Sequence, residues 1–223
     1  NIYTGTTTIK AGTLKLNVAG SLASTSIIVG DAGSSGAILD ATTRTGGFTV
    51  ASGQTVSGVG TIQGSTTFQS GGNLTPGNSG AGVFSNLGNI ALQSGSSFNL
   101  DITSAALGSG YDQLNVTGAV TLGGLLAVNM GAFVPSNGSL FFVLANDSTD
   151  AISGVFSNTP TNGGTYTLGG QQFQISYFGN HTGAGAGTFT GGNDVVLMAV
   201  PEPSASLFGG IGVLLLLRRR RSA

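Results

Sequence analysis

The segment IALQSGSSFNLDI, from Ile90 to Ile102, alternates apolar and polar residues on both sides of a Ser-Gly break. Ile90 and Leu92 alternate before the break, and Phe98 and Leu100 alternate after it. A period of two places successive side chains on opposite faces of a β-strand, and glycine permits the tight turn between strands. The segment therefore predicts two short strands, each with one buried face, joined by a turn.

The same pattern recurs along the first 130 residues. It is found in TTIKAGTLKL (Thr7 to Leu16), FTVASGQTVSGVG (Phe48 to Gly60), TTFQSGGNLTPG (Thr66 to Gly77) and VTLGGLLAVNM (Val120 to Met130). The break glycines Gly12, Gly53, Gly71, Gly95 and Gly123 are 41, 18, 24 and 28 residues apart, and the first gap contains a further candidate unit, SIIVGDAGSSGAILDA (Ser26 to Ala41). Units of this length are too short to bury a face alone, which predicts that they stack as the coils of a β-solenoid.

Stacked coils require rows of inward side chains. At about 4.8 Å per coil, some six coils would make a rod roughly 30 Å long. A β-sandwich, which also has short strands at regular spacing, is the alternative fold. The alternation predicts the following inward residues: Ile9, Leu14, Leu16, Ile28, Ile38, Val50, Val56, Ile62, Phe68, Leu74, Ile90, Leu92, Phe98, Leu100, Val120, Leu122 and Val128.

The composition supports strands and excludes several other classes of protein. Charged residues make up 7% of the chain, glutamate occurs once and cysteine is absent. A disordered chain would be richer in charge, a helical bundle would be richer in glutamate and lysine, and disulfides cannot stabilise the fold. Without Arg218 to Arg221, three basic residues face eight acidic ones. Such a weakly acidic body lacks the cluster of cations that nucleic-acid binding requires.

The texture of the sequence changes near Phe133. Nine of the sixteen aromatic residues lie between Phe133 and Phe189. An open last coil would expose unpaired strand edges, so we expect residues 133–198 to form strands that close the solenoid. The alternative function for these aromatic residues is a platform on which sugars stack.

Two parts of the chain resemble a known repeat. YTGTTTIKAGTLKL (Tyr3 to Leu16) resembles the autotransporter-associated β-strand repeat. GVGTIQGSTTFQSGGNLTPGNSGAG (Gly58 to Gly82) and YDQLNVTGAVTLGGLLAV (Tyr111 to Val128) resemble passenger-domain sequence of the same type. This resemblance implies a right-handed parallel β-helix that is exposed outside the cell.

The residues that could carry chemistry are scattered. The carboxylates are mostly single residues beside glycine or asparagine, and the lone histidine, His181, lies in the glycine-rich stretch FGNHTGAG, which predicts a solvated loop. Asp194, in GGNDVVL, is predicted to cap a turn, because one imperfect copy of a calcium-binding repeat offers too few ligands. Neither a serine elbow nor a phosphate-binding loop occurs. We expect no catalytic, cofactor or metal site, and the alternative is a polysaccharide lyase or hydrolase.

The last segment, VPEPSASLFGGIGVLLLLRRRRSA (Val200 to Ala223), differs from the rest of the chain. Its apolar stretch, Ala205 to Leu217, would be about 20 Å long as a helix, shorter than the roughly 30 Å hydrocarbon core of a bilayer. The four arginines that follow can reach one membrane interface. By the positive-inside rule they stay in the cytoplasm, which places the body on the other side of the membrane.

The order of these parts resembles the PEP-CTERM protein-sorting signal of Gram-negative bacteria. The resemblance implies export, retention in the inner membrane, and cleavage by an exosortase near the Pro-Glu-Pro motif. It also implies an association with exopolysaccharide and biofilm. An unprocessed tail anchor is the alternative. The matching residues are the sorting motif Pro201, Glu202 and Pro203, the transmembrane stretch Leu207, Phe208, Gly209, Gly210, Ile211, Gly212, Val213, Leu214, Leu215, Leu216 and Leu217, and the cytoplasmic anchor Arg218, Arg219, Arg220 and Arg221.

These observations predict an exported, non-enzymatic structural protein of the cell surface or extracellular matrix. Its expected parts are the solenoid repeats in residues 1–132, closing β-strands in 133–198, and the sorting signal, with a short hydrophobic helix, in 199–223. We expect a further N-terminal portion with a secretion signal, because the opening residues already follow the strand pattern. The alternative function is that of an adhesin that binds cells or surfaces through the solenoid flank.

Overall fold

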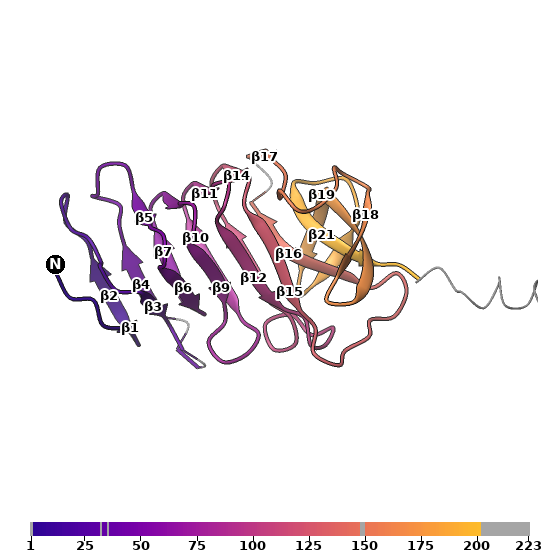
Figure 1. The fold of residues 1–223 in the computed structure, drawn as a ribbon, viewed down its shortest axis with the longest axis horizontal. Coiled ribbons are helices and arrows are strands. Elements are labelled where there is room, and N and C mark those ends of the chain that lie inside the picture. Colours follow the sequence, from indigo (N-terminus) through magenta and orange to yellow (C-terminus); the bar gives the residue numbers. More distant parts are fainter. Residues whose placement is uncertain (1, 32, 35, 148–149, 202–223) are drawn as a thin grey trace, which may run out of the picture.

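The computed structural model describes residues 2–31, 33–34, 36–147 and 150–201. Within these residues the chain is all β, and its strands form three main sheets that run along one common axis (Figure 1). The predicted β-solenoid is confirmed, and the β-sandwich alternative is wrong, because most strands pair in parallel with the strand three places later in the chain. The predicted C-terminal helix over Leu207 to Leu217 lies outside the described residues.

Each complete coil contributes one strand to each sheet. Sheet 1 contains β1 (Thr7–Ile9), β3 (Ser26–Val29), β6 (Thr55–Gly58), β9 (Asn73–Pro76), β12 (Ser97–Asp101) and β15 (Leu125–Asn129). Sheet 2 begins with β2 (Gly12–Lys15), β4 (Ala37–Asp40), β7 (Thr61–Gln63), β10 (Val83–Leu87), β13 (Gln113–Val116) and β16 (Leu140–Asn146). Sheet 3 contains β5 (Phe48–Val50), β8 (Thr66–Phe68), β11 (Ile90–Leu92), β14 (Val120–Leu122) and β17 (Ile152–Gly154).

The register between coils reproduces the spacing of the break glycines. In sheet 1, Val56 pairs with Leu74, Leu74 with Phe98, and Phe98 with Leu126. These steps are 18, 24 and 28 residues long, as are the intervals from Gly53 to Gly123. Gly12 is not equivalent to the other markers, because it begins β2 of sheet 2 whereas the others precede strands of sheet 1. This difference explains the long first interval.

The break glycines form a stack of turns at one corner of the solenoid. Gly71 and Gly95 have φ values of 80° and 82°, in the left-handed region where side chains are strained. The Gly53 N–H donates to the Gly71 carbonyl at 2.9 Å, and the Gly71 N–H donates to the Gly95 carbonyl at 2.8 Å. The turns are therefore hydrogen-bonded from coil to coil, like the strands.

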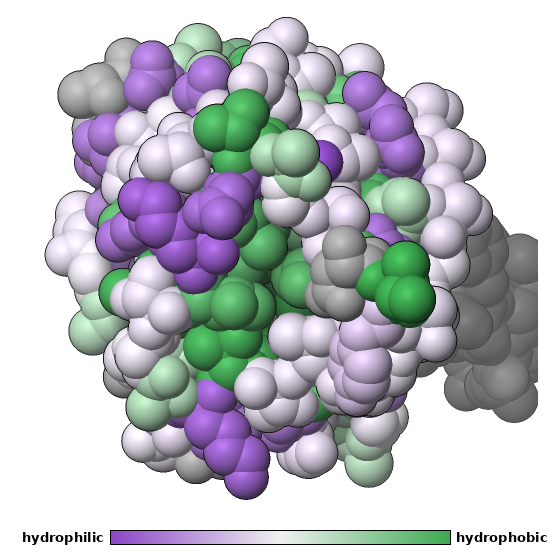
Figure 2. Space-filling view, turned by 90° about the vertical axis from the view of Figure 1, so that its left-hand side faces the viewer, coloured by the Kyte–Doolittle hydropathy of each residue, from purple (hydrophilic) through white to green (hydrophobic). Residues whose placement is uncertain are grey.

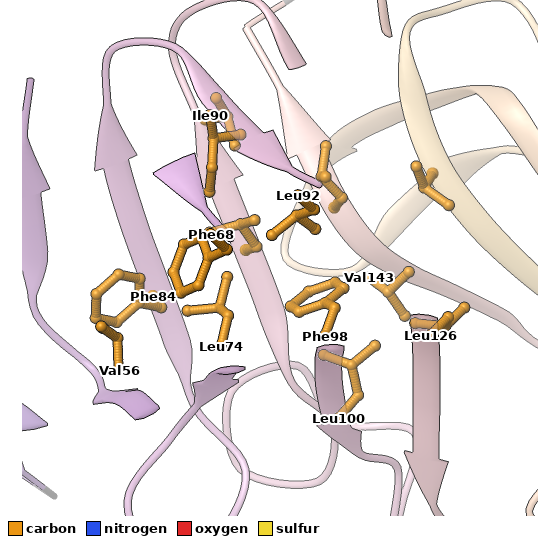
Figure 3. Packing of buried hydrophobic residues seen from close by; sticks show 14 of the residues in the cluster. Val56, Phe68, Leu74, Phe84, Ile90, Leu92, Phe98, Leu100, Leu126 and Val143 are labelled. Atoms are coloured by element: carbon orange, nitrogen blue, oxygen red, sulfur yellow. The ribbon is translucent and has the colours of Figure 1, made fainter. Parts of the chain in front are cut away.

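The inward side chains form one core along the solenoid. Figure 3 shows Phe68 from sheet 3, Leu74 from sheet 1 and Phe84 from sheet 2 pointing into the same space. Leu14 and Val128, both predicted to point inward, are partly buried against this core. The other predicted inward residues that are buried are Ile9, Leu16, Val50, Val56, Ile62, Phe68, Leu74, Ile90, Leu92, Phe98, Leu100, Val120 and Leu122.

Two predicted inward residues, Ile28 and Ile38, are wrong. Ile27 is fully buried and pairs with the inward Val56, so Ile28 lies on the outer face. Likewise Leu39 is buried and pairs with Ile62, so Ile38 lies on the outer face. Both residues sit in runs of consecutive apolar residues, where alternation cannot select a register. A shift by one residue moves every side chain of a strand to the opposite face.

Antiparallel strands cover the C-terminal end of the solenoid. In sheet 2, β16 pairs with β21 (Asp194–Ala199), which pairs with β19 (Gln171–Gly183), followed by β18 (Thr165–Leu168). The short β20 (Ala186–Thr188) pairs with β19. The side-chain amide of Asn158 accepts from the Leu126 N–H at 2.9 Å and donates to the Leu126 carbonyl at 2.8 Å. It therefore replaces, at that position of the β15 edge, the hydrogen bonds of a further strand.

The opposite end of the solenoid shows its apolar interior. The side chains of the first coil that contact the core are Ile9, Leu14, Leu16 and Leu22. Figure 2 looks at this end and shows apolar surface in a central hollow with hydrophilic residues around part of it. The two ends of the described body are therefore different, because antiparallel strands lie over one and solvent reaches the other.

Two adjacent glycines in the β4–β5 turn allow a test of how closely the coils pack. Gly46 and Gly47 have φ values of 81° and 74°, so alanine is strained at either position. A Cβ on Gly46 would meet nothing within 4 Å, whereas a Cβ on Gly47 would overlap the Ser65 carbonyl of the next coil. We expect Gly46→Ala to lower the free energy of unfolding by about 1–2 kcal/mol. Gly47→Ala should cost about 1–3 kcal/mol more. Urea denaturation followed by circular dichroism measures the difference, and equal losses would contradict the close contact.

Candidate functional site

The predicted sorting motif follows directly after the last hydrogen-bonded residue of the body. The Val200 N–H donates to the Gln172 carbonyl at 3.0 Å, and Pro201 is exposed. Glu202, Pro203, the apolar stretch Leu207 to Leu217 and the arginines Arg218 to Arg221 lie outside the described residues. No helix among the described residues has both the length and the apolar character needed to cross a membrane.

Asp112 is a buried carboxylate with a structural role. Its two oxygens accept the Gly82 N–H at 2.6 Å and the Asp101 N–H at 2.7 Å. The Asp112 N–H in turn donates to the Asp101 carbonyl at 2.9 Å. Gly82 precedes β10 in the neighbouring coil, so this one side chain joins two coils and fixes the end of β12. Burial raises the pKa of Asp112 to about 7, although both amide hydrogen bonds act in the opposite direction.

Asp194 has the same kind of role in the antiparallel end. Its carboxylate accepts the Asn146 N–H at 2.7 Å and the His181 N–H at 2.5 Å, so it joins β21 to β16 and β19. Sequence reasoning expected a cap on a local turn, but these two donors belong to other strands. Burial raises the pKa of Asp194, and the two amides counteract this effect.

His181 is not the solvated loop residue that the sequence predicts. It lies within β19, is partly buried, and its ring lies 5.1 Å from that of Phe142. Burial lowers its pKa against the opposing effect of Asp194. Asp194 contacts the backbone amide of His181. The Nε2 atom of the imidazole accepts the Gly185 N–H at 3.3 Å, so the ring takes part in local structure.

The remaining charged groups in the described residues do not converge on one site. Asp40 accepts hydrogen bonds from the hydroxyl and N–H of Thr42, which hold its pKa below the usual value, and lies 3.5 Å from Lys15. The Arg44 Nε donates to the Gly47 carbonyl at 2.8 Å, which stabilises the β4–β5 turn. In the described part of the chain, the histidine and carboxylate side chains form no group of three or more that could hold a metal ion.

The aromatic residues of the C-terminal region lie mostly in the core. Phe141, Phe142, Phe156 and Phe173 are fully buried, and the Phe98 and Phe156 rings are 6.0 Å apart in a stacked arrangement. Phe178 is an exception, with 56% of its surface exposed. The alternative of an aromatic platform for sugars is therefore wrong for the buried rings.

The outer faces of the solenoid carry rows of small polar side chains, because paired residues on successive strands point the same way. Rows of this kind place a hydroxyl, amide or methyl group every ~4.8 Å along the axis. The row on sheet 3 is Thr49, Thr67, Ala91, Thr121 and Ser153. One row on sheet 2 is Thr13, Ile38, Thr61, Ser85 and Asn115. One row on sheet 1 contains Thr8, Ile28, Ser57 and Thr75.

Sheet 1 bears a groove of about 220 Å³ across β9, β12 and β15. In Figure 1 the loops that follow these strands extend from the lower rim of the solenoid. Asp101 Oδ1 accepts the Asn129 amide at 2.7 Å, and Asn99 donates weakly to the Thr75 hydroxyl at 3.4 Å. We name this site the sheet 1 groove. Its lining residues are Thr75, Asn99, Leu100, Asp101, Ala127, Val128 and Asn129.

Sequence reasoning did not identify the sheet 1 groove, although part of the signal was present. The alternation around Phe98 and Leu100 implies that Asn99 and Asp101 face outward. That Asn129 lies beside Asp101 depends on the register between β12 and β15, which alternation alone does not determine. The structural role of Asp112 likewise depends on which coil carries Gly82.

The comparisons with known proteins do not assign a family. No protein-family model matches this chain, and a search of curated proteins finds no relative. The functional argument therefore rests on the sequence motifs and on the geometry of the solenoid.

The raised pKa of Asp112 predicts an unusual dependence of stability on pH. Its folded-state pKa of about 7 lies above the ordinary value of 3.8, so the folded state holds a proton that the unfolded state has lost. The associated stabilisation is complete below about pH 4 and disappears as the pH rises through 7. Because one pKa unit corresponds to about 1.4 kcal/mol, the loss amounts to at most about 4 kcal/mol. Asp194, whose pKa is also raised, contributes in the same direction.

We expect Asp112→Asn to flatten the fall in unfolding free energy between pH 4 and 8, because the amide does not titrate. The slope is the informative quantity, since the amide also loses one of the two hydrogen bonds. Asp31→Asn, on the β3–β4 loop, is the control and should keep the slope of the original chain. An unchanged slope in Asp112→Asn would show that this carboxyl is already ionised throughout the range.

Proposed function

We propose that the protein is an exported, non-enzymatic structural protein of the cell surface or extracellular matrix. Its C-terminal residues are a PEP-CTERM sorting signal, and an exosortase cleaves the chain near Pro201. The body lies on the periplasmic side while the tail holds the precursor in the inner membrane. After cleavage the solenoid passes to the envelope or the extracellular matrix, where exopolysaccharide is its neighbour.

One observation carries this proposal: the order of the C-terminal parts. Pro201, Glu202 and Pro203 precede the apolar stretch Leu207 to Leu217, and the arginines Arg218 to Arg221 follow it. An apolar segment flanked on one side by cations is oriented with those cations in the cytoplasm. The exposure of Pro201, next to the hydrogen-bonded Val200, supports access to this site by a processing enzyme.

The solenoid supports a structural rather than a catalytic role. Asp112 and Asp194, the two carboxylates most buried in the described residues, both bind backbone amides and join strands. Hydrolysis of a polysaccharide requires two carboxyl groups facing one substrate bond, or a metal with its ligands. The stacked coils instead provide long polar faces, which suit repeated weak contacts with a polymer.

The mature protein purified from its native host tests this proposal. We expect mass spectrometry of its C-terminal peptide to place the terminus between Pro201 and Ser204. Glu202→Gln should retain the tail through Arg221, because it removes the charge at the centre of the motif. Ser206→Ala, three residues beyond the motif, is the control and should be processed normally. Retention of Arg221 in the original chain would identify an ordinary tail anchor and refute the cleavage.

A further inference from the structure

The sheet 1 groove is held by the fold itself. The backbone of Asp101 is fixed on both sides by Asp112, which accepts its N–H and donates to its carbonyl. The Asp101 side chain is oriented by Asn129, whose own Oδ1 accepts the Gly131 N–H at 3.3 Å. The polar groups in the groove therefore have fixed directions before any ligand arrives, which reduces the entropic cost of binding.

The lining groups are complementary to hydroxyl groups. Each carboxylate oxygen can accept two hydrogen bonds, and Asn99 and Thr75 can each donate and accept. Their one mutual contact is long, at 3.4 Å, so these two side chains retain capacity for a ligand. Ala127 and Val128 add apolar surface beside them. Alternating hydroxyls and C–H groups, as on a sugar ring, match this mixture of polar and apolar lining.

The charge of the groove indicates a neutral ligand. Asp101 is the charged residue that lines it, so an anionic sugar would be repelled. Two of the cations of the body are engaged elsewhere, since Lys15 lies beside Asp40 and Arg44 binds the Gly47 carbonyl. A second hollow, of about 420 Å³, is lined by the β4–β5 turn, and the side chain of Arg44 supports that turn.

The size of the groove limits the ligand to a small unit. Its volume of about 220 Å³ is below the ~300–1,000 Å³ of pockets that enclose drug-sized molecules. Because the groove lies on the flank of an elongated body, a polymer can place one unit in it and continue across the polar rows of sheet 1. We propose that the sheet 1 groove binds a single sugar unit of a neutral polysaccharide.

This inference adds a ligand class to the proposed function and rests on it only for the biological setting. Affinity gel electrophoresis of the full chain tests it in vitro, in gels that contain hydroxyethylcellulose, dextran, galactomannan or the anionic alginate. We expect at least one of the three neutral polymers to retard the protein, and alginate to leave its mobility unchanged. Retardation by none of the neutral polymers, or retardation by alginate alone, would overturn the proposal.

Matched variants locate the binding. Asn99→Ala combined with Asn129→Ala removes two neutral hydrogen-bonding groups and should weaken the apparent affinity about tenfold. Asn115→Ala, which lies on the outer face of sheet 2, should bind as the original chain does. Ala127→Leu fills the groove and should also weaken binding, whereas Thr121→Leu on sheet 3 should not. Equal binding by groove variants and controls would contradict the site.

The failure of this inference is distinguishable from that of the proposed function. The gel experiment does not depend on the tail, and the processing experiment does not depend on the groove. A chain that is cleaved near Pro201 but ignores all three neutral polymers would keep the sorting proposal and refute the sugar site. Thermal melts of each variant by circular dichroism confirm that the outward substitutions leave the solenoid folded.

Discussion

The structure depends on the backbone hydrogen bonds that join each coil to the next. A single coil of about 18 to 28 residues has too little apolar surface to fold alone, so each coil is stable only between neighbours. Leu74 illustrates this dependence, since it pairs with Val56 on one side and with Phe98 on the other. The same register fixes the outer face, because it places Asp101 opposite Asn129 and the Gly71 turn beside that of Gly95. Differences in coil length are absorbed by the loops at the corners.

The two ends of this stack have different physical problems. At the C-terminal end, antiparallel strands β18 to β21 and the Asn158 amide provide partners for edges and apolar surface. At the N-terminal end, Figure 2 shows part of the apolar interior in a hollow. Asp112 and Asp194 repeat one device at different levels of the body, in which a buried carboxylate accepts two backbone amides from separate strands. Their burial explains why the acidic residues of this chain contribute to architecture.

Much of the fold could be predicted from the sequence where apolar residues strictly alternate. Leu74 and Phe98 were assigned to the core because polar residues flank them on both sides, whereas Ile28 and Ile38 were misplaced because their neighbours are also apolar. Which strands share a sheet, and the contact of Asp101 with Asn129, depend on residues 28 positions apart and were not predictable from alternation. His181 was assigned to a loop because glycines surround it, although pairing within β19 determines its conformation. The sorting signal, by contrast, is a linear motif.

In this account, coils that stack in register carry polar rows on their outer faces, and every functional proposal for the body uses those rows. Distances between spin labels test the stacking directly, and the absence of cysteine makes labelling selective. Labels on Thr8→Cys paired with Ser57→Cys, Asn99→Cys or Ala127→Cys occupy one row, two, four and five coils apart. Electron–electron resonance should give separations that rise by about 4.8 Å per coil, to roughly 24 Å across five. Separations that do not rise in proportion to the number of coils would contradict the stacked solenoid.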